Sequence, residues 1–109
     1  MHLKINNDKL PIYVANTMKK KIRGLLGLKK IDFGLLIPEC NKIHTFGMQM
    51  NIDIIALDER NCVLFKYQNM SPNKMIVIEE NIKKTSILEL PANTSQKIYI
   101  GDILTFEFE

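Results

Sequence analysis

Short apolar runs separated by turn residues constrain the fold of this chain more than any other feature. The run Ile52–Leu57 is apolar almost throughout and rich in β-branched residues, which predicts a central strand covered on both faces. A second run, 10–15, contains Pro11, which has no backbone N–H and therefore favours an edge position. We expect further strands at 3–5, 33–37, 62–68, 75–79, 85–90, 98–100 and 103–108. So many strand edges favour a sheet that closes partly on itself.

Only one segment has the spacing of a helix. Thr17 is at an N-cap position, and Gly27 is suited to the end of the helix, although Gly24 could stop it earlier. The apolar residues between them form one stripe at helical spacing: Met18, Ile22, Leu25 and Leu26. We therefore predict an α+β fold, mostly antiparallel, with a small barrel-like sheet and one helix in the N-terminal half packed on it. The 109 residues are the length of a single domain, 1–109.

Charge is distributed unevenly along the chain. The net charge is +3, but residues 1–30 contain eight Lys or Arg and one acid, whereas 31–109 contain seven bases and eleven acids. The basic region 19–30 could steer an anionic partner, and weak nucleic-acid binding is one alternative function. Because no aromatic residues are interleaved with these bases, a solvated helix face is the preferred interpretation.

The richest polar segment, Cys40–Asp53, lies between two apolar runs and is expected near the core. Polar groups there need partners, from the protein or from a ligand. Asp53 lies within an apolar strand, and its expected partner is Arg23, either as an ion pair that holds the helix or as a ligand-binding arginine. The candidate ligand-binding residues are Arg23, His44, Thr45, Phe46, Met48 and Asp53.

Cys40 and His44 could instead form a metal site or a catalytic thiol pair. The chain has no Cys-x-x-Cys motif, and His2 is the other histidine, so a divalent metal ion is only an alternative and no cofactor is expected. Cys40 and Cys62 are expected to be free thiols. Glu89, between two leucines, is expected to point outward because residues alternate along a strand.

Several motifs resemble those of a known family, the domain of unknown function 192. The similarity covers nearly the whole chain, in order: Ala15–Thr17, Arg23–Leu26, Gly34–Ile37, Ile43–Met48, Ile52–Asp53, Asp58–Val63, Ser71–Pro72, Leu88–Ala92 and Ile98–Leu104. The stretch from Cys40 through His44–Phe46 resembles a subgroup with a Cys-x-x-x-His-Thr-Phe core. The resemblance implies a mostly antiparallel β domain with one helix near the N-terminus, and no settled activity. Asn61 and Asn93 replace two expected glycines, which suits turns because Asn tolerates left-handed backbone.

Together these features predict a binding or accessory domain rather than an enzyme. The site is expected around His44–Met48, with a small molecule or a protein as the partner. No apolar run approaches the ~20 residues that span a bilayer, and the N-terminal segment lacks a signal-peptide core, so a cytoplasmic protein is expected. The alternatives are a thiol- or metal-dependent enzyme using Cys40 and His44, and the nucleic-acid binder described above.

Overall fold

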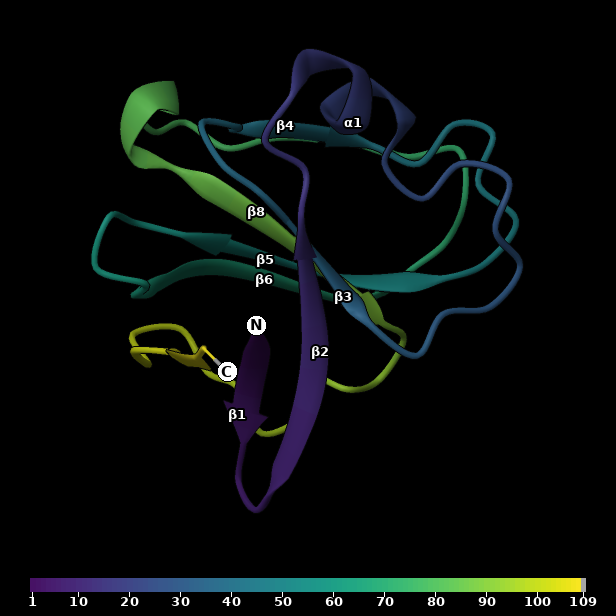
Figure 1. Cartoon of the computed structure of the whole chain (residues 1–109). Coiled ribbons are helices and arrows are strands. Elements are labelled where there is room, and N and C mark those ends of the chain that lie inside the picture. Colours follow the sequence, from purple (N-terminus) through teal and green to yellow (C-terminus); the bar gives the residue numbers. More distant parts are fainter. Residues whose placement is uncertain (109) are drawn as a thin grey trace.

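A curled sheet forms most of the molecule. The structure, a computed structural model, describes residues 1–108, and the side chain of Ile22 lies outside that description. Within these residues one seven-stranded sheet has the order β6-β5-β8-β3-β2-β1-β9, and a small sheet pairs β4 with β7 (Figure 1). The elements are β1 His2–Ile5, β2 Asp8–Val14, α1 Met18–Arg23, β3 Gly34–Ile37, β4 Lys42–His44, β5 Ile52–Leu57, β6 Val63–Met70, β7 Met75–Val77, the 3-10 helix η1 Ile82–Lys84, β8 Ser86–Pro91 and β9 Thr105–Glu107.

The strand pairs are antiparallel except β2 and β3, which run parallel. A parallel pair needs a long crossover connection, and residues 15–33, which include α1, supply it. The expected edge position of Pro11 is wrong, because β2 lies between β1 and β3. Pro11 is tolerated there because it pairs only with His2 of β1, and the ladder to β3 begins at Ile12.

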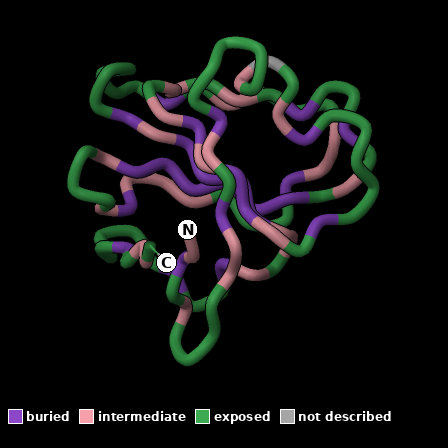
Figure 2. Tube along the Cα trace, in the orientation of Figure 1, coloured by how far each residue is buried: buried purple, intermediate pink, exposed green. Residues whose placement is uncertain are grey.

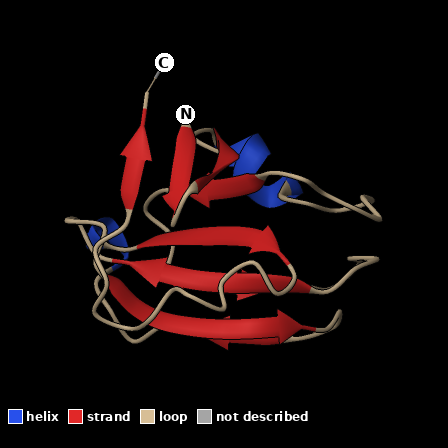
Figure 3. Cartoon of the chain, turned by 90° about the horizontal axis from the view of Figure 1, so that it is seen from below, coloured by secondary structure: helices blue, strands red, loops and turns tan. Residues whose placement is uncertain are grey.

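The C-terminal segment links the two ends of the curled sheet. Residues 98–100, expected as a strand, are irregular and lead into a turn at 100–101, and the chain then bonds to the start of β6. Val63 N donates to Asp102 O at 2.8 Å, and Leu104 N donates to Asn61 O at 2.9 Å. The chain continues into β9, which lies beside β1 (Figure 3). The sheet is thus a half-barrel, in agreement with the barrel-like arrangement expected from the sequence.

Apolar side chains pack on both faces of the main sheet. On β5, Ile52, Ile54 and Ala56 join one cluster, whereas Ile55 and Leu57 join the other. Ile43 of β4 and Ile76 of β7 also pack against the first cluster, and the second includes Leu3 of β1 and Ile12 of β2. Figure 2 shows buried residues along the strands that cross the middle of the molecule. The prediction that 52–57 is a central strand covered on both faces is confirmed.

The expected helix that packs on the sheet is not confirmed. α1 is only six residues long; Thr17 caps it by accepting from Lys20 N at 3.2 Å, and it ends at Gly24, which has φ 49°. Met18 is 72% exposed and Leu26 36% exposed, so they do not form a buried stripe. Leu25 is buried, but it lies beyond the helix, and the side chain of Ile22 lies outside the described residues. The early stop follows from the backbone of Gly24, which residues with a Cβ rarely adopt.

Left-handed turns occur at both asparagines that replace an expected glycine. Asn61 has φ 62° and Asn93 has φ 68°. Asn61 lies in the turn between β5 and β6, and Asn93 follows β8, so each keeps a turn that glycine would otherwise make.

Gly34 allows β3 to pack closely against its neighbours, and substituting alanine should destabilise the protein. A Cβ there would lie 2.6 Å from Ile12 Cδ1 and 2.9 Å from Leu90 Cδ2, and both side chains are buried. We expect Gly34→Ala to lower the free energy of unfolding by about 1–3 kcal/mol, the usual cost of overpacking. Urea denaturation would measure it, and unchanged stability would mean that Ile12 and Leu90 can move aside freely.

Candidate functional site

Glu89 is the most unusual residue of the central sheet. It lies in the middle of β8, in register with Leu35 of β3 and Ile54 of β5. Its side chain is completely buried, and neither carboxyl oxygen has a hydrogen-bond partner among the described residues. The expectation that Glu89 points to solvent is wrong, because both faces of β8 are covered and alternation there provides no solvent face.

The environment of Glu89 disfavours its charged form. Its lateral neighbours are apolar, and the removal of water raises the pKa of the Glu89 carboxyl to about 8. At pH 7 most molecules therefore carry a neutral carboxylic acid in the core. Buried polar groups without partners are rare and costly, and they concentrate at functional sites.

Glu89 is at the inner end of a pocket of about 730 Å³ between the main sheet and its cover. The pocket is lined by residues of α1, β3, β4, β7, η1 and β8 and of the segments after α1 and around β4. They are Met18, Lys21, Arg23, Gly24, Leu25, Leu26, Ile37, Glu39, Cys40, Asn41, Lys42, Ile43, His44, Met48, Val77, Ile82 and Glu89. Leu25, Ile37 and Met48 are its buried apolar members, and the completely buried Glu89 marks the floor. Gly24 lies over the carboxyl, since a Cβ there would be 3.6 Å from Glu89 Oε1.

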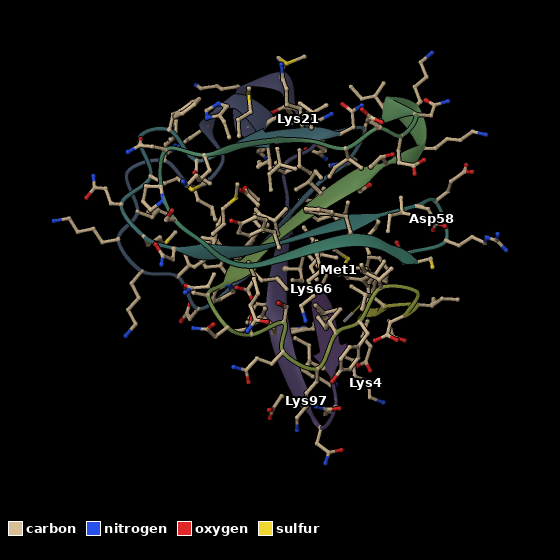
Figure 4. The ribbon with its side chains drawn as sticks, turned by 180° about the vertical axis from the view of Figure 1, so that it is seen from behind. Met1, Lys4, Lys21, Asp58, Lys66 and Lys97 are labelled. Carbon is tan, nitrogen blue, oxygen red and sulfur yellow. The ribbon has the colours of Figure 1, made fainter. Side chains whose placement is uncertain are left out.

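The rim of the pocket is basic. Lys21 and Arg23 come from α1, and Lys42 and His44 come from β4, whereas Glu39 is the acid that lines the same rim. Figure 4 shows Lys21 at the side of the molecule covered by α1 and β4. With His44 neutral, these rim residues sum to a charge of +2, which favours an anionic group at the mouth.

His44 is exposed on β4, and its ring stacks on Phe46, with centroids 5.4 Å apart and planes at 24°. Strand β4 was not expected from the sequence, because the residues around it show no clear period. It forms by pairing with β7, where His44 is in register with Met75. Phe46 contacts the His44 ring but does not itself line the pocket.

Two of the predicted site residues have partners within the protein. Asp53 accepts hydrogen bonds from the backbone N–H groups of Asn69, Asn93 and Ser95, at 2.8–2.9 Å, and from the Ser95 hydroxyl. It is completely buried, whereas Arg23 is exposed, and no ion pair joins them within residues 1–108. Thr45 is also buried: its hydroxyl donates to Ser71 O and accepts from Lys74 N, both at 2.9 Å.

Cys40 and Cys62 are both free. Cys40 lines the pocket, and its thiol donates to Lys42 O with Sγ 3.1 Å away. No group of three or more His, Cys, Asp or Glu side chains is placed to hold a metal ion in the described part of the chain. Cys40 and His44 line the same pocket, and within these residues no third ligand is grouped with them.

The sequence interpretation missed Glu89 as a pocket residue. A signal was present: an acid flanked by leucines in a strand that, like Ile52–Leu57, could be covered on both faces. Of the predicted residues, the pocket brings together Arg23, His44 and Met48, with Cys40 of the alternative site.

Comparison with known proteins gives one family and two similar folds. The model of the DUF192 family, described as "Uncharacterized ACR", matches residues 1–106. A crystal structure of a protein of unknown function from Novosphingobium aromaticivorans DSM 12444 is similar, with a TM-score of 0.79 and 14% identity over 96% of this chain and 82% of that chain. The crystal structure of a "putative transcription regulator" from Sinorhizobium meliloti 1021 has a TM-score of 0.77 and 17% identity over 95% of this chain and 89% of that chain. No curated protein matches the chain significantly.

No helix in the described residues is long and apolar enough to cross a membrane.

Proposed function

We propose, given that the chain belongs to the uncharacterised DUF192 family, that this protein binds a small amphipathic molecule in the pocket above Glu89. The observation that carries the proposal is a fully buried carboxyl, without a partner in residues 1–108, at the floor of a pocket with a basic rim. Binding sites typically combine apolar walls with a few convergent polar groups of perturbed pKa.

Apolar side chains around the mouth support an amphipathic ligand. Met18, Val77 and Ile82 line the pocket and are at least half exposed. Exposed apolar groups beside cations suit a molecule with an apolar body and an anionic group. Arg23 and His44 are the proposed contacts for the anion, and Met48 is a proposed wall residue.

A thiol enzyme has less support. The Cys40 thiol donates to a backbone carbonyl, a contact that a thiolate could not make. A non-catalytic binding role needs no activated nucleophile and uses the same pocket.

The proposal predicts that rim substitutions weaken binding of an amphipathic anion without affecting the fold. The probe is 8-anilinonaphthalene-1-sulfonate, which combines aromatic rings with a sulfonate and fluoresces in apolar sites. We expect one probe molecule per chain, with Arg23→Ala and His44→Ala each weakening binding up to about tenfold, the loss of one charge-assisted contact.

Lys30→Ala is the matched control, because Lys30 is an exposed base near Arg23 in sequence that does not line the pocket. It should leave binding unchanged. Equal affinities in the wild type, Arg23→Ala and His44→Ala would contradict the proposed site.

A further inference from the structure

The two ends of the pocket require opposite chemical groups from a ligand. At the floor, Glu89 presents two oxygen atoms to which no described residue donates a hydrogen bond. At the rim, Lys21, Arg23 and Lys42 are cationic. Leu25, Ile37, Ile43 and Met48 lie along the wall that separates the floor from the rim. A matching ligand has a donor at its inner end, an apolar middle and an anion at its outer end.

The inner end is best satisfied by an ammonium group. It carries several N–H donors and a positive charge, so it can serve both oxygens of Glu89 and stabilise the carboxylate in a site of low dielectric. A hydroxyl donates a single hydrogen bond and brings no charge. A metal ion is disfavoured, because residues 1–108 contain no group of three or more His, Cys, Asp or Glu side chains that could hold one.

The carboxyl can be approached at Gly24. Glu89 has no exposed surface, so a ligand that reaches it must displace the chain that covers it. Gly24 has no side chain to remove, and its φ of 49° marks the end of a helix with only six residues. A short helix end is the part of the cover that can move at least cost.

Resting on the proposed function, we propose that the ligand is a zwitterion whose ammonium group pairs with Glu89 and whose anionic group meets Arg23 and the rim lysines. The ligand class is an ω-amino acid: an amine and a carboxylate, or a similar anion, joined by an apolar chain.

Ligand binding then releases a proton. The ligand enters as an ammonium ion, Glu89 changes from carboxylic acid to carboxylate, and its proton passes to the buffer. The other titratable groups around the pocket are Lys21 and Arg23 from α1, Glu39 and Cys40 before β4, and Lys42 and His44 on β4. β3 and β5 present Leu35 and Ile54 to Glu89, and β7 contributes Val77 to the pocket, so none of these strands adds a titratable group there.

The test is isothermal titration calorimetry on the full chain with 4-aminobutanoate, 6-aminohexanoate and 8-aminooctanoate. Each has three matched analogues of equal chain length: the carboxylate without the amine, the amine without the carboxylate, and the hydroxy acid. We expect one amino acid of the series to bind at least tenfold more tightly than its three analogues. At pH 7, the binding enthalpy of that amino acid should change linearly with the ionisation enthalpy of the buffer. The slope should correspond to the release of close to one proton per bound ligand.

Two variants separate the ends of the ligand. Glu89→Gln should abolish the preference for the amino acid over the hydroxy acid and the proton release. Arg23→Ala should reduce the preference for the amino acid over the amine. Lys30→Ala, away from the pocket, should change neither preference.

The failure of this inference differs from failure of the proposed function. The zwitterion proposal is contradicted if the carboxylates or hydroxy acids bind as tightly as the amino acids. It is also contradicted if no amino acid binds while binding of the fluorescent anion still depends on Arg23 and His44. In both cases the pocket binds ligands, but its ligand is not an ω-amino acid. If the fluorescent anion is insensitive to Arg23 and His44, the proposed function itself fails.

Discussion

Replacing Glu89 by glutamine is expected to stabilise the protein by about 4 kcal/mol at pH 8, because it removes a buried carboxyl that has no partner within residues 1–108 and that ionises freely only in the unfolded chain. The ordinary pKa of this side chain is 4.5, and burial raises it to about 8 in the folded state. Between these values the folded protein holds a proton that the unfolded chain releases. The contribution of Glu89 to stability is therefore fully present below pH 4.5 and is lost as the pH rises towards 8.

The pH dependence provides the sharper measurement. Across this window the wild type should lose about 1.4 kcal/mol of unfolding free energy per pH unit relative to Glu89→Gln. Urea denaturation at pH 5, 6, 7 and 8 gives both curves. Backbone hydrogen bonds lower the pKa of Asp58, and Lys9 lowers the pKa of Glu107. These two acids therefore change the stability of the protein at lower pH than Glu89 does. Because both variants contain these acids, their effects cancel in the difference.

Glu79→Gln is the matched control, since Glu79 is exposed and lies outside the pocket. Its curve should follow that of the wild type at every pH. Parallel curves for the wild type and Glu89→Gln would show that Glu89 has a partner or water in solution and keeps an ordinary pKa. A stabilised Glu89→Gln that also loses ligand selectivity would fit the usual trade-off, in which a functional group lowers stability.

Local pattern was sufficient to predict most of the strands, though it missed β4 and placed a strand at 98–100 that does not form, and it did not predict the neighbours of the strands in the sheet. The central position of Ile52–Leu57 could be predicted locally, because both faces of this run are apolar. The edge position predicted from Pro11 was wrong because a proline removes only its own N–H from the ladder. The pairing of β2 with β3 begins at the next residue, Ile12. Pairing partners depend on long-range contacts that a local period does not encode.

The same limit explains the partial success at the site. Arg23, His44 and Met48 were singled out for their chemistry, and they line one pocket because β4 pairs with β7 and α1 ends beside it. The side chain of Glu89 was predicted to point to solvent because the alternation argument assumes that one face of a strand is exposed to solvent. In a half-barrel with a second layer, the central strands have no wet face, and only the three-dimensional arrangement reveals this.

Asp53→Ala is expected to be the most destabilising substitution, lowering the free energy of unfolding by about 4 kcal/mol or more. Asp53 joins β5 to the end of β6 through Asn69 and to the chain after β8 through Asn93 and Ser95. Removing its carboxylate leaves three backbone donors and one hydroxyl without their acceptor inside the protein. For a domain of this size, the midpoint of thermal unfolding should fall by roughly 15 °C or more.

Asp53→Asn and Ser95→Ala remove smaller parts of the hydrogen-bond network around Asp53. Asparagine keeps one acceptor oxygen, so it should cost less than alanine, and Ser95→Ala removes only the hydroxyl donor and should cost about 1 kcal/mol. Under conditions where Asp53→Asn remains folded, it should bind the fluorescent anion as the wild type does, because Asp53 does not line the pocket. An Asp53→Asn protein of normal stability that no longer binds the anion would return Asp53 to the ligand site and contradict its structural role.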